Sequence, residues 1–332
     1  MARTQRRQPP PPPSRPLAGS PPTPIKLPGW GAILDTITAE ELDSDAGEVI
    51  LLPQEYEERS EVEPEAYWRN QDDASRCWTS TFIYQHIQPH PRLARFIRPD
   101  EWTGLPVLAK PDGPPLETFI KSHKSSMYGM VSNSSPATAT VRIQDTHKPL
   151  IYQWALQLAD ALARVHSYGK AETPSIWIAF GDVDMSKCWL TAGLNIQLVG
   201  FLNAACRIPG EPMHFGSRTN GSAFHPLEGK RGEHDSPTEQ TDVFMWGCLV
   251  HELMTGAWPD DSVPYPEVIT TGQWPRLESE YLGEVISNCW TGEIADGASL
   301  VDRLRSTISG LGWQVNEDML VGFDAEALIA QS

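Results

Sequence analysis

The stretch from Phe180 to Phe201 restricts the fold of this chain more than any other. It contains two short apolar segments, 188–190 and 196–199, which are separated by the turn-prone sequence Thr191-Ala192-Gly193. This pattern predicts a β-hairpin. A loop that carries two acids leads into the hairpin, and these acids are Asp182 and Asp184. The sequence therefore places its most reactive side chains at the entrance of a short hairpin.

Helical signals lie on both sides of this stretch. Pro149 opens a helix with large apolar residues at helical spacing, which ends near Gly169. A second helix begins at the capping-box sequence Ser236-Pro237-Thr238-Glu239, with proline at the first helical position, and ends at Gly256. Each pattern predicts one apolar face that is buried against the rest of the domain.

Several motifs of the chain resemble those of eukaryotic protein kinases. The acidic loop and its hairpin are similar to the kinase catalytic loop, H-x-D-x-K-x-x-N, followed by a strand pair and D-F-G. Residues 74–87 have the spacing of the kinase regulatory helix. Further segments match H-P-x-I/L, D-x-x-x-x-G and E-L-x-T-G, namely His90–Leu93, Asp242–Gly247 and Glu252–Gly256. The exact wording of the motifs, such as C-W-x-G-E at Cys289–Glu293, is most similar to that of kinase-like proteins of filamentous fungi.

The resemblance implies an α+β, bilobal protein-kinase-like fold. It covers residues 29–311, with a small β-rich lobe at 29–104 and a larger α-helical lobe at 105–311. Residues 1–28 contain ten prolines and are predicted to form a disordered or polyproline II tail. Residues 312–332 are interpreted as a C-terminal tail. The resemblance also implies that Phe180 stacks on Phe201 and that Asp242 caps the backbone of the catalytic loop.

Most reactive positions of the kinase motifs carry other residues here. By the resemblance, Asp182 stands at the position of the catalytic base. Asp184 replaces the catalytic-loop lysine, Lys187 replaces the metal-binding asparagine, and Gly200 stands where D-F-G has its metal-binding acid. The lysine and glutamate that pair in the kinase small lobe are also replaced: the lysine by Leu51, or by Leu52 if the register shifts by one residue, and the glutamate by Ser80.

These replacements bear directly on the chemistry. Phosphoryl transfer needs magnesium and a cation on the phosphates and a carboxylate at the incoming hydroxyl. Magnesium requires oxygen ligands, which Gly200 and Lys187 do not offer. The sequence therefore predicts a catalytically impaired, pseudokinase-like module that binds or regulates another protein, without a resident cofactor or metal. Asp182 then remains as a structural acceptor, and Lys187 is the candidate for holding a nucleotide without metal.

Two alternatives stay open at this point. The first is an atypical active Ser/Thr kinase that transfers the γ-phosphate of ATP to protein hydroxyls, with ATP and Mg²⁺ as cofactors. In that case Lys110 or Lys187 supplies the phosphate-binding lysine. The second is a nucleotide sensor without turnover.

Composition restricts the partners. The chain of 332 residues has a formal net charge of −17, which argues against a polyanionic partner such as nucleic acid or an anionic membrane. The five cysteines are scattered without a C-x-x-C pair, so buried reduced thiols and an intracellular location, cytoplasmic or nuclear, are expected. No apolar run reaches the length of a membrane span. A protein partner is expected, and the proline-rich tail is a candidate ligand for an SH3-type domain.

Two stretches are predicted to be loops. Residues 122–140 contain eight Ser and Thr and few large apolar residues, which predicts a mobile loop inserted in the larger lobe. Residues 170–175 are interpreted as a surface insertion before the acidic loop.

Overall fold

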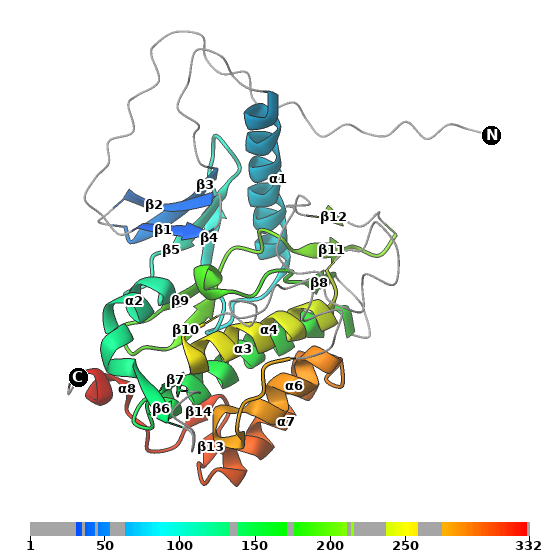
Figure 1. Ribbon diagram of the computed structural model, residues 1–332. Coiled ribbons are helices and arrows are strands. Elements are labelled where there is room, and N and C mark those ends of the chain that lie inside the picture. The colour runs from blue at the N-terminus through cyan, green and yellow to red at the C-terminus, as the bar shows by residue number, and fades with distance from the viewer. Residues whose placement is uncertain are drawn as a thin grey trace.

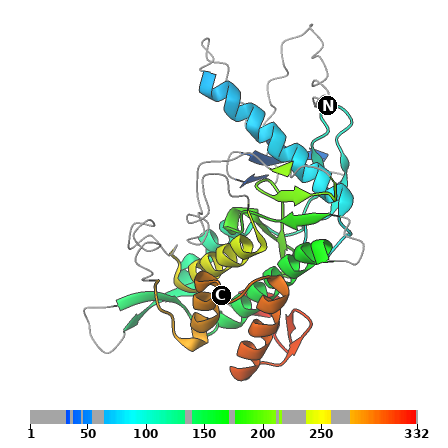
Figure 2. The ribbon, with the colours of Figure 1, turned by 90° about the vertical axis from the view of Figure 1, so that its right-hand side faces the viewer.

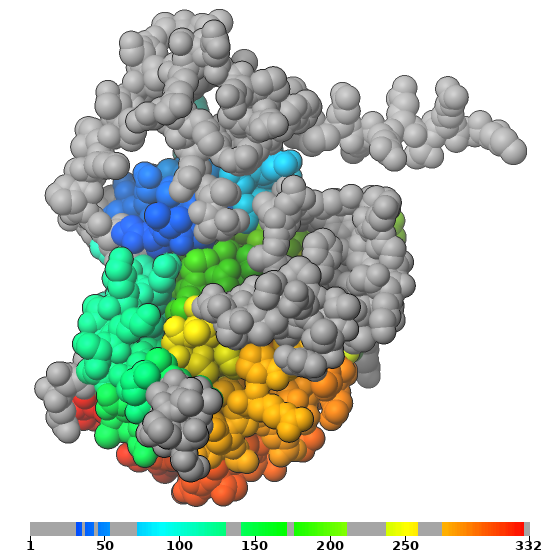
Figure 3. All heavy atoms as spheres, viewed as in Figure 1, coloured from blue at the N-terminus to red at the C-terminus, as the bar shows by residue number. Residues whose placement is uncertain are grey.

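The computed structural model describes residues 31–34, 37–43, 46–53, 64–132, 139–170, 176–210, 214–215, 237–257 and 274–330. The predicted N-terminal tail and residues 171–175 of the predicted insertion lie outside these ranges. Within them the protein is a mixed α+β structure, with a small antiparallel sheet at one end and helices at the other (Figure 1). In the space-filling view, the blue residues of the sheet lie directly above the green residues of the helical part (Figure 3).

The sheet has five antiparallel strands in the order β1-β2-β3-β5-β4. The strands are β1 (Gly31–Leu34), β2 (Ile37–Asp43), β3 (Glu48–Pro53), β4 (Phe96–Pro99) and β5 (Pro106–Ala109). Strand β3 is the central strand, and its residues Val49, Ile50 and Leu51 are buried. Because β5 pairs with both β3 and β4, the sheet extends beyond residue 104, the predicted end of the small lobe.

Helix α1 (Pro64–His86) lies against this sheet (Figure 1). The helix predicted at 74–87 is therefore present, and it begins ten residues earlier than its apolar spacing indicates. Cys77, Ile83 and Tyr84 are buried between the helix and its neighbours. Their burial explains the helical spacing that the sequence shows over this part of α1.

Helix α3 (Lys148–Ser167) is the centre of the helical part. It packs against α7, α4 and β10, and fourteen of its residues are buried. The predicted helix is confirmed, but it is buried on most sides, because other elements surround it. The neighbouring helices are α2 (Leu116–Met127), α4 (Glu239–Thr255), α6 (Gly283–Thr291) and α7 (Gly297–Gly310), with the short helices η1 (Tyr168–Lys170) and η3 (Ser279–Tyr281).

The start of α4 differs from the prediction by two residues. Thr238, not Ser236, is the N-cap, and its hydroxyl accepts a hydrogen bond from the backbone N–H of Thr241 at 3.2 Å. The hydroxyl of Thr241 accepts the reciprocal bond from the Thr238 backbone at 3.1 Å, which completes the capping box without Glu239. The predicted end is confirmed, because Gly256 is the C-cap with a φ of 72°.

The predicted hairpin is confirmed as β9 (Cys188–Leu190) and β10 (Ile196–Leu198), which pair antiparallel. Before it, the chain passes through β8 (Trp177–Ala179) and the 3-10 turn η2 (Met185–Lys187). After it, β11 (Ala205–Arg207) joins β8 to β12 (His214–Phe215). The acidic loop is therefore held at both ends by paired strands.

The mobile loop predicted at 122–140 is wrong for the residues that the structure describes. Residues up to Met127 complete α2, and β6 (Tyr128–Ser132) pairs with β7 (Ala139–Ile143) in a hairpin that points away from the helical part (Figure 2). Buried Tyr128 and Ile143 anchor its base, and the Tyr128 hydroxyl donates to the backbone oxygen of Leu253 at 3.0 Å. The prediction of a loop relied on the many Ser and Thr residues of this segment and gave no weight to these few buried residues.

The segment interpreted as a C-terminal tail is folded over residues 312–330. It forms the hairpin β13 (Val315–Asn316) and β14 (Met319–Leu320), followed by α8 (Ala325–Ala330). Strand β14 lies beside α3. All five cysteines are buried free thiols, as the sequence predicts. Among the described residues, none of the helices combines the length and the apolar run that a bilayer crossing requires.

Candidate functional site

The loop between β8 and β9 positions the candidate site. Asp184 caps the turn η2, because its Oδ1 accepts hydrogen bonds from the backbone N–H groups of Ser186 at 2.7 Å and Lys187 at 3.2 Å. The Ser186 hydroxyl donates to the same oxygen at 2.5 Å. This cap gives Asp184 a structural role that a lysine at the same position cannot fill.

The structure brings Asp182, Asp184 and Lys187 together around one buried ammonium group. Lys187 Nζ lies 3.4 Å from Asp182 Oδ2 and 3.5 Å from Asp184 Oδ2, and it donates to Ser186 Oγ at 2.8 Å. Only 1% of Lys187 is exposed. A buried ammonium is stable only when it is paired and hydrogen-bonded, and this one contacts two carboxylates.

Asp182 is a buried acid with a raised pKa. Its Oδ2 accepts a hydrogen bond from Asn203 Nδ2 at 2.6 Å. The pKa of Asp182 is raised from 3.8 to about 6, chiefly by burial and also by the charge of Asp184, while Lys187 and the hydrogen bond from Asn203 act in the opposite direction. A carboxyl group that titrates near pH 6 is suited to general-base work. Here, however, the oxygen that contacts Lys187 also accepts the hydrogen bond from Asn203.

Asp242 holds the start of the acidic loop, as the resemblance implies. Its carboxylate accepts hydrogen bonds from the backbone N–H groups of Phe180 at 2.7 Å and Gly181 at 2.6 Å. His166 Nε2 lies 2.9 Å from the same carboxylate, while His166 Nδ1 accepts from the backbone N–H of Gly297 at 3.0 Å. The proton of a neutral His166 is therefore on Nε2. Three donors from two separate parts of the chain thus meet one buried carboxylate.

An aromatic column joins this loop to the sheet. Phe180 contacts Phe201 at a centroid distance of 5.1 Å, so the predicted contact between these rings is confirmed, although they meet edge-on and are not stacked. Phe201 contacts Tyr84 of α1 at 4.9 Å, and Tyr84 stacks on Phe96 of β4 at 5.5 Å. Such aromatic pairs stabilise a fold beyond their buried area. The column connects both parts of the protein through side chains.

Gly200 lies beside this column, with a backbone that favours glycine. Its φ is +108°, and its N–H donates to the hydroxyl of Tyr84 at 3.2 Å. A Cβ at this position would lie 3.1 Å from Leu202 Cγ. The position that the resemblance gives to a metal-binding acid therefore has no side chain and little room for one.

The two small-lobe positions where the resemblance implies a lysine and a glutamate carry buried, uncharged side chains. Leu51 is fully buried in β3, opposite Ala39. Ser80 is buried in α1, and its hydroxyl makes no hydrogen bond to the described residues. Lys110, the other candidate lysine, is 2.9 Å from Glu41 Oε1 of β2. The structure thus does not bring Lys110 into the cluster around Lys187, and the described residues contain no group of three metal-ligating side chains.

A cleft of about 500 Å³ lies on another side of the aromatic column, between the end of α1 and β4. Tyr84 and Phe96 form part of its wall, so the cleft and the column share side chains. None of its lining residues belongs to the loop 180–187. The lining residues are Tyr84, Gln85, Ile87, Gln88, Pro89, His90, Leu93, Ala94, Arg95 and Phe96.

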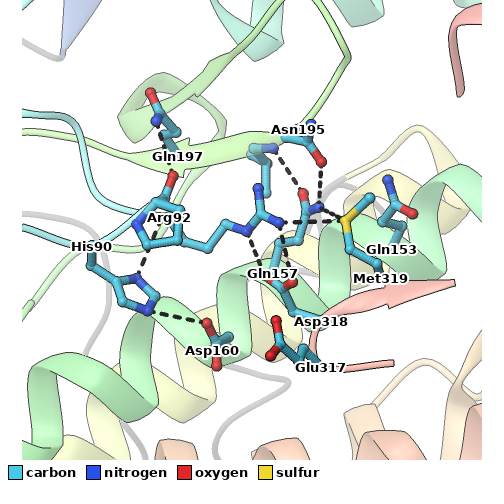
Figure 4. A network of polar contacts seen from close by, with 12 residues as sticks. His90, Arg92, Gln153, Gln157, Asp160, Asn195, Gln197, Glu317, Asp318 and Met319 are labelled. Atoms are coloured by element: carbon cyan, nitrogen blue, oxygen red, sulfur yellow. Dashed lines mark hydrogen bonds and ion pairs between the residues drawn. The ribbon is translucent and has the colours of Figure 1, made fainter. Parts of the chain in front are cut away.

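A second polar network holds the C-terminal segment against the loop that follows α1 (Figure 4). Arg92 donates through Nε and Nη2 to both carboxylate oxygens of Asp318, with an Nη2–Oδ1 distance of 3.1 Å. The same Nη2 lies 3.4 Å from the sulfur of Met319. His90, two residues earlier, is 3.3 Å from Asp160 of α3. The H-P-x-L segment is therefore fixed from two sides.

The same network reaches the hairpin of the candidate site. Gln157 of α3 donates to Asn195 Oδ1 at 2.7 Å and accepts from the backbone N–H of Ile196 at 2.9 Å. Gln197 of β10 donates to the backbone oxygen of Pro91 at 2.9 Å. The hairpin, α3 and the loop after α1 are thus connected by polar side chains.

Sequence reasoning missed several of these residues. Asn203 has no local pattern that marks it as a partner of Asp182. Arg92 and Asp318 are separated by 226 positions, so their pairing has no signal in the sequence. The sequence indicates Tyr84 only as one position of a helical face, whereas its ring and hydroxyl contact Phe201 and Gly200.

Comparisons with known proteins add no assignment. No protein-family model matches the chain, and a search of curated proteins finds no match to it.

Proposed function

We propose that the chain is a protein-kinase-like module that has lost catalysis and acts by binding or regulating another protein. The antiparallel sheet with α1, next to a helical part, is compatible with the small β-rich lobe and the larger helical lobe that the resemblance implies. The caps at Asp242 and the contact between Phe180 and Phe201 support the same proposal.

The observation that carries the proposal is the ammonium group of Lys187. It stands at the sequence position of a metal-binding asparagine and contacts the carboxylates of Asp182 and Asp184. A magnesium ion here would have to approach a fixed positive charge, and it would have to compete with that charge for the same two carboxylates. Both effects oppose the binding of a magnesium–nucleotide complex.

Three further positions support the loss of catalysis. Leu51 and Ser80 remove the cation and the acid that would position the phosphates, and Gly200 removes a second metal ligand. Loss of a single electrostatic donor at an active site costs a factor of roughly 10² to 10³ in rate. Losses at several such positions are not additive, yet together they abolish useful turnover.

The proposal is tested by thermal unfolding of the full chain with ATP, with and without Mg²⁺. A ligand that binds only the folded state raises the unfolding temperature. We expect no Mg²⁺-dependent rise for the native chain. The variant Lys187→Asn restores the kinase residue and tests whether the ammonium group of Lys187 prevents the binding of Mg²⁺–ATP. Lys124→Asn, at an exposed position of α2, is the matched control.

Two results would contradict the proposal. Mg²⁺-dependent stabilisation, together with ATP consumption that disappears in Asp182→Asn, would establish the atypical active kinase. Stabilisation by ATP that does not depend on Mg²⁺ and disappears in Lys187→Asn, without turnover, would indicate a nucleotide sensor.

A further inference from the structure

The turn between β4 and β5 presents a tryptophan to solvent on a rigid support. Trp102 is 83% exposed. Asp100 Oδ1 accepts hydrogen bonds from the backbone N–H groups of Trp102 at 3.1 Å and Thr103 at 2.8 Å, and from the Thr103 hydroxyl at 2.7 Å. The backbone under the exposed ring is therefore held in one conformation.

Side chains of helix α1 form hydrogen bonds to the backbone of the same turn. The indole N–H of Trp78 donates to the backbone oxygen of Thr103 at 2.9 Å, and the Thr81 hydroxyl donates to the backbone oxygen of Gly104 at 2.9 Å. Trp78 is itself 44% exposed. Two exposed tryptophans thus belong to the same turn, one within it and one hydrogen-bonded to it, and we call them the Trp78–Trp102 surface. Exposed aromatic side chains on a fixed backbone are typical of a docking anchor.

The hydrogen bonding of this surface indicates what it can bind. The indole N–H of Trp78 is occupied by Thr103, whereas that of Trp102 makes no hydrogen bond to the described residues. An indole offers a flat apolar face and one donor. A proline-rich segment in polyproline II conformation offers apolar rings and carbonyl oxygens without internal hydrogen bonds, and such segments dock on aromatic surfaces.

The chain contains a segment with this chemistry and the complementary charge. Residues 1–28, which the structure does not describe, hold ten prolines, five Lys and Arg, and no acid. Since five of the 26 basic residues and none of the 43 acids lie there, the rest of the chain has a net charge of −22. Glu101, next to Trp102, is exposed and adds a local negative charge.

The segment is long enough to reach this surface. β1, which begins at Gly31, and β4 are the two edge strands of the sheet, four strand spacings apart. At about 4.8 Å per spacing and about 3.3 Å per residue along a strand, Gly31 lies roughly 25 Å from the β4–β5 turn. The 18 residue steps from Pro13 to Gly31 span up to about 56 Å in polyproline II conformation, at about 3.1 Å per step.

We propose that the proline-rich segment 1–28 docks on the Trp78–Trp102 surface of its own chain. Docking within one molecule proceeds at a high effective concentration, so a modest contact is sufficient. Binding of the segment to an SH3-type partner would then release this surface, and the two events would compete.

The test places a nitroxide on residue 14 of the full chain through Ser14→Cys. The five native cysteines are buried, so the new thiol reacts selectively. With ¹⁵N-labelled tryptophan, the indole signal of Trp102 is assigned by its absence in Trp102→Phe. We expect this signal to lose intensity and to recover when the nitroxide is reduced. Trp313, in the segment after α7 at the opposite end of the protein, serves as the control signal and is expected to stay unchanged (Figure 1).

Three results would overturn the proposal. The first is a Trp102 signal that keeps its intensity in the spin-labelled chain. The second is an equal loss in a mixture of spin-labelled and ¹⁵N-labelled chains, which would show docking between two copies. The third is a loss that persists after the five prolines at 9–13 are replaced by alanine, which would show that charge alone attracts the segment.

Discussion

Replacing Asp182 by asparagine tests the electrostatics of the candidate site through the pH dependence of stability. Burial raises the pKa of Asp182 from 3.8 to about 6 in the folded protein. The folded state therefore binds this proton more tightly than the unfolded state does. It follows that the contribution of Asp182 to stability is greatest below about pH 4 and is lost as the pH rises through about 6.

The magnitude follows from the same values. The interval between 3.8 and about 6 corresponds to at most about 3 kcal/mol, at about 1.4 kcal/mol per pH unit. The substituted asparagine cannot titrate, yet its side-chain oxygen can still accept the hydrogen bond from Asn203. Between pH 4 and pH 7, the unfolding free energy of the native chain is therefore expected to fall by up to about 3 kcal/mol relative to that of Asp182→Asn.

The assay is urea unfolding at a series of pH values, followed by tryptophan fluorescence. The difference between the two proteins is the quantity to compare, because the other titrating groups are common to both. Lys187→Met is the second variant. Because Lys187 lowers the pKa of Asp182, its removal is expected to move the loss of the Asp182 contribution to a higher pH range. A difference that is independent of pH, or one that grows in favour of the native chain as the pH rises, would refute the reasoning.

Three further substitutions test other parts of the structure by urea unfolding. Asp242→Asn presents an amide to three N–H donors and is expected to cost about 2 to 4 kcal/mol; a variant as stable as the native chain would refute the role of this carboxylate. Arg92→Met breaks the paired contact to Asp318 and is expected to cost about 1 to 3 kcal/mol. It should accelerate hydrogen exchange within 312–330, and unchanged exchange there would count against the contact. Gly200→Ala places a Cβ at a φ of +108° and is expected to cost about 1 to 3 kcal/mol, so a neutral effect would contradict the strain.

Much of the local structure could be predicted from the sequence. The hairpin after the acidic loop, the helix opened by Pro149 and the end of α4 at Gly256 all follow from short-range signals. These signals depend on turn chemistry, caps and periodicity, which act over a few residues. The resemblance added the contact between Phe180 and Phe201, which the structure confirms.

The errors arose where a few specific contacts outweigh composition and local pattern. The many Ser and Thr residues of 122–140 predict a loop, but buried Tyr128 and Ile143 anchor a hairpin at its base. The sequence favours Ser236 as the N-cap of α4, although both Ser236 and Thr238 are good caps. The hydroxyl of Thr241 decides in favour of Thr238.

The sequence by itself determined the elements that hold the candidate site and the residue types within it, because local backbone preferences act on neighbouring residues. Only the tertiary structure decided that Lys187 turns back to Asp182, that Asn203 joins them and that Asp318 binds Arg92. The physical reason is that burial and charge pairing depend on distance in space. Burial and the neighbours that the fold gathers around it therefore set the pKa of Asp182, and the distant Arg92 sets the position of the C-terminal segment.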